Sequence, residues 1–186
     1  MIFKRFDELY ISAVLTFVKS PTQEYNDEAL LKRLGAPKIN KLDTKEDILS
    51  DDIWPKVCIM DVDGWICILD DYYGLYNINV LHLESILPSL SNDFGEVLLV
   101  GYFNEASEAF ILQYCKDGKS VREIDYETEH RPNQINIKEY GSGKQLNELP
   151  SILNFNEIEL YIKEVMSNFG ITIESDISKG RFYSIG

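Results

Sequence analysis

The sequence predicts an α+β fold: a mainly antiparallel sheet of about five or six strands, with N-terminal helices and a C-terminal helix packed on it. Five short runs rich in β-branched and aromatic residues occupy positions 56–126, and segments with helical periodicity precede and follow them. With 186 residues, 45% of them hydrophobic, the chain can bury a substantial core. We therefore expect one domain over residues 1–186, with an N-terminal helical segment (1–35), a sheet (56–126) and a closing helix (155–170).

The N-terminal segment is predicted to contain two helices. Between Phe6 and Val18, large apolar residues recur at the i, i+3, i+4 and i+7 spacing of one helical face, and Ser20-Pro21 would end this helix. A second helix is predicted from about Asn26 to Leu34, with Asn26 or Asp27 as its cap and Gly35 at its end. Residues 36–55 are polar and are predicted to be a connection without regular structure.

The predicted strands are Lys56–Met60, Trp65–Asp70, Glu96–Phe103, Glu108–Cys115 and Ser120–Tyr126. Short turn-forming linkers join the last three strands, which predicts an antiparallel meander. The first and third strands are apolar on both faces, so we expect them to lie centrally in a sheet that is covered on both sides.

Two further helices are expected. Leucines and isoleucine over residues 83–90 have helical spacing, in a segment that Pro88 would divide. A strong closing helix is predicted to begin at a cap on Asn156 and to end at Gly170. Ile171–Glu174 is predicted to add a short strand, and residues 177–186 to be a surface tail.

The charge of the chain is concentrated in its middle. The net charge is −13, and residues 43–129 alone carry 19 acidic and 5 basic side chains, a net charge of −14. Such a surface repels nucleic acids and anionic membranes and attracts basic proteins, although an acidic surface can also serve solubility alone. No apolar run approaches the roughly 18 residues that a membrane-spanning helix needs, so we expect a cytoplasmic protein without a membrane partner.

The sequence indicates neither a metal site nor a cofactor. The three cysteines, Cys58, Cys67 and Cys115, lie in apolar strand-like runs and lack metal-ligand spacing, so we expect buried free thiols. Neither of the two histidines is followed by a second candidate ligand at i+3 or i+4.

The DVDG sequence at Asp61–Gly64 raises the question of catalysis. An apolar strand followed by this pattern resembles the first motif of the haloacid dehalogenase phosphatases, in which the two aspartates, here Asp61 and Asp63, would be nucleophile and acid or base. The resemblance covers about seven residues, because a new strand follows at Trp65 where that family has a helix. We therefore predict a hairpin turn at Asp63-Gly64 and a protein that is not an enzyme.

The order of features from Trp54 to about residue 175 resembles an uncharacterised bacterial family. Its members share a Gly-Trp strand, here GWICILDD at residues 64–71, a later strand with a short hairpin into an aromatic strand that ends in Asp-Gly, and a closing helix that ends in glycine. In this chain a helix-like segment (VLHLESILPSL, 80–90) follows the Gly-Trp strand. The style of the chain, acidic and α+β, is also similar to that of immunity proteins encoded beside secreted bacterial toxins. This resemblance implies a protein that neutralises its cognate toxin by occluding the active site.

The contact with such a basic partner is predicted to use acidic residues of the strands and turns, with three tyrosines as aromatic anchors. Two alternatives stay open: an adaptor or subunit that binds a basic protein, and a metal-dependent hydrolase that uses the carboxylates. The predicted contact residues are Asp61, Asp63, Tyr72, Tyr73, Tyr76, Glu105, Glu108, Glu123, Asp125, Glu127 and Glu129.

Overall fold

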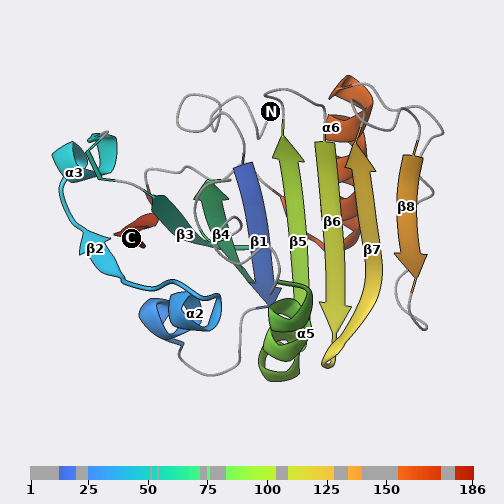
Figure 1. Cartoon of the computed structure of the whole chain (residues 1–186), viewed down its shortest axis with the longest axis horizontal. Coiled ribbons are helices and arrows are strands. Elements are labelled where there is room, and N and C mark those ends of the chain that lie inside the picture. The colour runs from blue at the N-terminus through green and yellow to red at the C-terminus, as the bar shows by residue number, and fades with distance from the viewer. Residues whose placement is uncertain are drawn as a thin grey trace.

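One antiparallel sheet organises the structure (Figure 1). The computed structural model describes residues 13–19, 25–50, 52–53, 55–71, 75, 83–103, 109–127, 134–139, 155–172 and 179–186. Within these residues nine strands follow the order β2-β9-β3-β4-β1-β5-β6-β7-β8, and each neighbouring pair is antiparallel. The α+β class and the antiparallel pairing are confirmed, but the sheet is larger than the five or six strands predicted. The strands are β1 (Ala13–Lys19), β2 (Asn40–Leu42), β3 (Lys56–Val62), β4 (Trp65–Asp71), β5 (Glu96–Phe103), β6 (Ala109–Lys116), β7 (Lys119–Glu127), β8 (Gln134–Glu139) and β9 (Arg181–Ser184).

Helices cover both faces of this sheet. Helices α2 (Asp27–Arg33) and α5 (Leu83–Phe94) lie on one face, and α6 (Phe155–Asn168) lies on the other (Figure 1). Two buried apolar clusters match these layers, one containing leucines of α2 and α5 and the other the inner face of α6. Strands β3, β4, β1 and β5 contribute side chains alternately to both clusters, which agrees with the central position predicted for β3 and β5.

The first predicted helix is wrong where the structure describes it, because residues 13–19 form β1 between β4 and β5. Val14 and Val18 enter the core beneath α2 and α5, whereas Leu15 and Phe17 enter the core beneath α6. A strand that is buried on both faces has no polar side to show its period of two, so its apolar residues also fit helical spacing. Residues 6–12 lie outside the described part of the chain.

Two segments predicted to lack regular structure belong to the fold. The polar connection contains β2 and a short helix, α3 (Lys45–Leu49), and the predicted surface tail contains β9. Strand β9 pairs with β2 and β3 and buries Phe182 and Tyr183. Elements of three to five residues are too short to show a period, and tertiary pairing decides whether they form. No strand forms at Ile171 and Thr172, and the rest of the predicted strand there lies outside the described residues.

Two Asp-Gly turns connect consecutive strands. Asp63 and Gly64 have φ angles of 49° and 79°, and Asp117 and Gly118 have φ angles of 47° and 79°. Positive φ at both central residues is the geometry of a type I′ turn, whose twist matches that of the flanking strands. The hairpin predicted at Asp63-Gly64 and the β5-β6-β7 meander are therefore confirmed.

The helices depart from the predictions in detail. Helix α2 follows the expected Asn26 cap, whose Oδ1 accepts hydrogen bonds from two backbone N–H groups. Helix α5 runs through Pro88 without the predicted division, and α6 begins at Phe155, so Asn156 lies inside the helix. Gly170 ends α6 with a φ angle of 69°, a conformation that costs glycine little.

Candidate functional site

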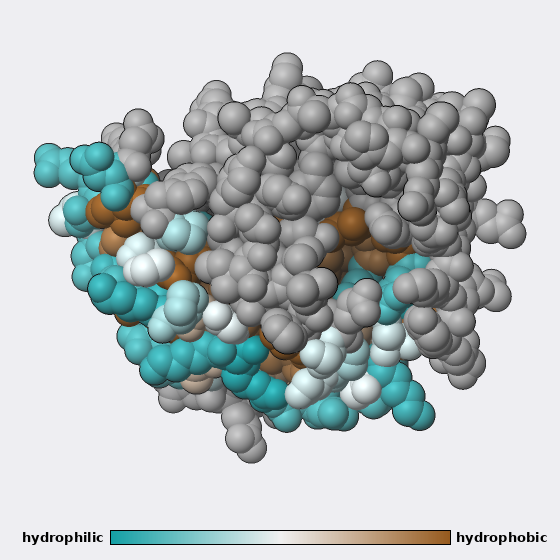
Figure 2. Space-filling view, viewed as in Figure 1, coloured by the Kyte–Doolittle hydropathy of each residue, from teal (hydrophilic) through white to brown (hydrophobic). Residues whose placement is uncertain are grey.

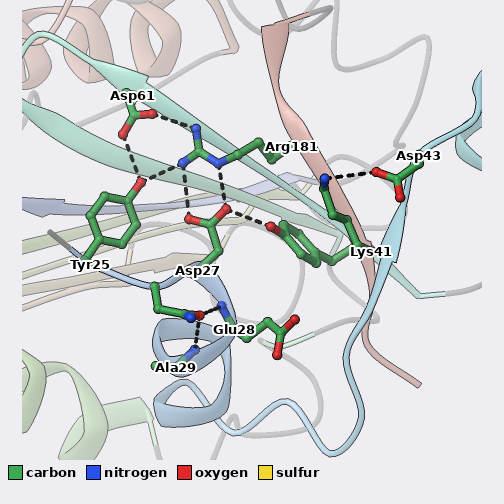
Figure 3. A network of polar contacts seen from close by, with 10 residues as sticks. Tyr25, Asp27, Glu28, Ala29, Lys41, Asp43, Asp61 and Arg181 are labelled. Carbon is green, nitrogen blue, oxygen red and sulfur yellow. Dashed lines mark hydrogen bonds and ion pairs between the residues drawn. The ribbon is translucent and has the colours of Figure 1, made fainter.

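A polar network lies where the start of α2 meets the ends of β3 and β9 (Figure 3). Arg181 on β9 is paired with Ile59 on β3, and Asp61 follows two residues later on the same face of β3. This is the face that α2 covers, because the neighbouring Ile59 belongs to the core cluster beneath that helix. The alternation of side chains along two paired strands thus aims a guanidinium and a carboxylate at the same helix end.

Arg181 is the centre of the network (Figure 3). Its Nε and Nη2 donate to the two carboxylate oxygens of Asp27 at 2.6 and 3.2 Å, a bidentate pair. Its Nη1 donates to Asp61 Oδ2 at 2.6 Å, and its Nη2 also donates to the Tyr25 hydroxyl at 2.6 Å. Tyr25 in turn donates to Asp61 Oδ1 at 2.9 Å, and Tyr183 donates to Asp27 Oδ2 at 2.8 Å.

Contacts within the network shift the pKa values of Arg181 and Asp61 so that both groups stay charged. Hydrogen bonds to Asp27 raise the pKa of Arg181 further, so the guanidinium stays charged. Burial opposes ionisation of Asp61, but hydrogen bonds from Arg181 and Tyr25 outweigh burial and lower its pKa. Burial and the hydrogen bond to Asp27 raise the pKa of Tyr183 to about 12. Both tyrosines consequently remain neutral donors at neutral pH.

A hollow of about 440 Å³ opens beside this network, within the size range of small-ligand sites. Three carboxylates, two cations and two phenol rings line it. The lining residues are Tyr25, Asn26, Asp27, Glu28, Lys41, Asp61, Arg181 and Tyr183. Lys41 also pairs at 3.0 Å with Asp43, which lies outside the hollow.

The two aspartates of DVDG have different structural partners. Asp61 binds Arg181 and Tyr25, whereas Asp63 Oδ2 accepts a hydrogen bond at 2.7 Å from the backbone N–H of Thr172, just after α6. The hairpin tip is therefore attached to β9 on one side and to the end of α6 on the other. The two carboxylates do not converge on one point, as a nucleophile and its acid or base would have to do.

The predicted contact residues in the described part of the chain do not form one patch. Glu123 lies on β7, where its Oε1 accepts hydrogen bonds from Gln113 and Ser120. Five strand spacings separate β7 from β3, which places Glu123 roughly 24 Å from Asp61 across the sheet. Asp61 and Glu123 cannot therefore contact the same partner side chain.

The other predicted contact residues lie partly or wholly outside the described part of the structure. Asp125 and Glu127 belong to β7, but their side chains lie outside the described part of the structure. Six further residues fall wholly outside it: Tyr72, Tyr73, Tyr76, Glu105, Glu108 and Glu129.

Four members of the polar network were missed by sequence reasoning: Tyr25, Asp27, Arg181 and Tyr183. The sequence predicts Asp27 only as a helix cap and the segment of Arg181 as a surface tail. The two adjacent aromatic residues of RFYS at 181–184 are a weak strand signal, because aromatic residues favour strands. Nothing in the sequence links this segment to Asp61, which is 120 residues away.

The described residues contain no group of three or more histidine, cysteine, aspartate or glutamate side chains that could hold a metal ion. Burial raises the pKa values of the three cysteine thiols, to about 12 for Cys58, and all three are buried and free. None of the described helices combines the length and apolar character needed to cross a membrane. Comparisons with known protein families, with curated proteins and with solved structures gave no match to this chain.

Proposed function

We propose that this chain is a non-catalytic binding protein that neutralises a basic partner, a cognate bacterial toxin, by covering its active site with an acidic surface. The single observation that carries the proposal is the location of the charge, 19 acidic and 5 basic residues between positions 43 and 129. A concentrated negative surface speeds association with a basic partner and disfavours neutral ones.

Among the described residues of this segment, burial withdraws more basic than acidic side chains from the surface. Lys56 and Arg122 are 6% and 4% exposed, so two of its five basic side chains contribute little to the surface. The Lys56 ammonium is held inside by the carbonyls of Ile48 and Ser50, at 2.8 and 2.5 Å. Among the acidic residues of the segment, Asp70 is the buried exception in the described part of the chain.

The corner formed by β2 and α3 presents part of this surface. Asp43, Glu46 and Asp52 are exposed there, and Figure 2 shows hydrophilic surface over α3, β2 and α2. Asp43 has a side-chain partner in Lys41, but both groups are more than half exposed, so this ion pair neutralises the corner only weakly.

The proposal is tested with the chain as bait in a lysate of its source organism at low and moderate salt. A second bait carries Asp43→Asn, Glu46→Gln and Asp52→Asn, and a matched control carries Asp43→Glu, Glu46→Asp and Asp52→Glu, which keeps the charge. We expect the native and control baits to recover one basic protein in a salt-sensitive manner, and the neutralised bait to recover less of it.

The captured protein is then produced alone and together with the chain. The proposal requires that it stops growth when alone and that the chain restores growth. A captured basic protein without toxicity would replace the immunity function with the alternative of an adaptor or subunit. Recovery that is equal for all three baits would refute the role of the acidic corner.

A further inference from the structure

The hollow beside Arg181 is bordered by one carboxylate, that of Glu28, which among the described residues does not join α2 to a strand. Arg181 and Asp27 join β9 to α2, which explains the buried part of the network. Glu28, by contrast, is exposed at the edge of the hollow, and within the described residues its carboxylate takes part in no hydrogen bond or ion pair. The hollow is thus bordered by a carboxylate that stabilises the first turn of α2 but pairs with no other element among the described residues.

The lining disfavours an anionic occupant. Of the five N–H groups of Arg181, four already donate to Asp27, Asp61 and Tyr25. The other cation, Lys41, pairs with Asp43 outside the hollow. An anion would have to displace carboxylates that hold the guanidinium at 2.6 Å and would also face the charge of Glu28.

The same lining suits a planar cation. Asp61 has a side chain that is 58% exposed, so its carboxylate remains accessible to solvent while it binds Arg181. Half-buried Tyr25 lines the hollow beside it (Figure 3), and an aromatic ring and carboxylates together are typical surroundings of a guanidinium group.

We propose that the hollow receives an arginine side chain of the basic partner, with Glu28 and Asp61 as its counter-ions. This inference rests on the proposed function, because it adds a defined anchor to the general attraction of the acidic surface. Arg181 acts here as a positioning residue that holds Asp61 at the wall of the hollow, and it does not contact the anionic groups of a ligand.

The test uses N-acetyl-arginine methylamide as the probe, titrated into the ¹⁵N-labelled chain and followed by NMR. Its neutral citrulline analogue has nearly the same shape and is the control ligand. Glu28→Gln is the test variant and Glu164→Gln the matched control, since Glu164 is also exposed on a helix but lies on α6, outside both the hollow and the acidic corner.

We expect saturable shifts at the amides of residues 25–28, 41, 61 and 181–183, with half-saturation at about millimolar probe. Glu28→Gln should weaken binding about threefold or more, as removal of an exposed counter-ion does, and Glu164→Gln should not. Equal shifts with the citrulline analogue, equal affinity in Glu28→Gln, or no saturable shift would each overturn the inference.

The affinity of the captured partner for native chain and for Glu28→Gln distinguishes this inference from the proposed function. A partner that binds the chain and loses about threefold or more in affinity with Glu28→Gln supports both. If it binds native chain and Glu28→Gln equally, the hollow is not its anchor, although the binding function stands. Probe binding without any toxic partner in the lysate would support the hollow as an arginine site and refute the immunity function.

Discussion

Replacement of Arg181 by methionine tests the polar network as a structural unit. Methionine keeps much of the side-chain length but removes the guanidinium and its four hydrogen bonds. Asp27, whose side chain is only 12% exposed, then keeps the hydroxyl of Tyr183 but loses its cation. A largely buried carboxylate without a counter-ion is unfavourable, because burial penalises the charged form.

The magnitude follows from the exposure of the three charged groups. Removing one partner of a buried ion pair costs about 3–5 kcal/mol, whereas an exposed pair contributes about 0–1 kcal/mol. The side chains of Arg181 and Asp61 are 34% and 58% exposed, so solvent screens part of the interaction. We expect the free energy of unfolding to fall by about 2–3 kcal/mol.

Urea unfolding followed by far-ultraviolet circular dichroism measures this change, with the m-value as a check that both proteins unfold in the same way. Lys41→Met is the matched control, because Lys41 and Asp43 form an ion pair with side chains that are 56% and 72% exposed. The control should lose less than about 0.5 kcal/mol. Equal losses in Arg181→Met and Lys41→Met would refute the structural role of the network.

The pH dependence gives an independent check. The folded-state pKa of Asp61 is lowered, so its ionised form stabilises the fold above its unfolded pKa of about 4. This contribution is lost as the pH falls through the lowered folded-state value. The difference in stability between native chain and Arg181→Met should therefore be smaller at pH 3 than at pH 7, and a larger difference at pH 3 would contradict the assignment.

Three further measurements test other parts of the fold. The hydroxyl of Ser91, 0% exposed on α5, accepts a hydrogen bond from the N–H of Gly118 at 2.9 Å, so Ser91→Ala should cost about 1–3 kcal/mol in urea unfolding. Asn26→Ala removes the cap of α2 and should cost about 1 kcal/mol; no loss would show that the cap is dispensable. The three cysteines are buried and their pKa values are raised, to about 12 for Cys58, so a thiol reagent at pH 8 should modify them in urea but hardly in the native chain.

Long elements with a clear pattern were predictable. The bounds of β5 agree with the predicted strand Glu96–Phe103, and the hairpin at Asp63-Gly64 follows from local chemistry, because aspartate and glycine tolerate positive φ. The closing helix was also predicted, and its buried residues from Tyr161 to Met166 recur at helical spacing.

The polar network was not predictable in the same way. Its aspartates were visible as charged residues, and Asp61 was predicted to contact a partner, but its binding to Arg181 depends on β9 lying beside β3. A pairing between strands 120 residues apart leaves no local period in the sequence. The same reason explains why the sequence of β9 predicts a surface tail.

The sequence by itself determined the acidic character of the middle segment, the Asp-Gly turns, and most of the strands and helices, because each depends on composition or on neighbours within a few residues. Tertiary structure alone decided that residues 13–19 form a central strand and that Arg181 gathers Asp27 and Asp61 around one hollow. In both cases the partner that satisfies the hydrogen bonds or the charge comes from a distant part of the chain, where local patterns carry no information.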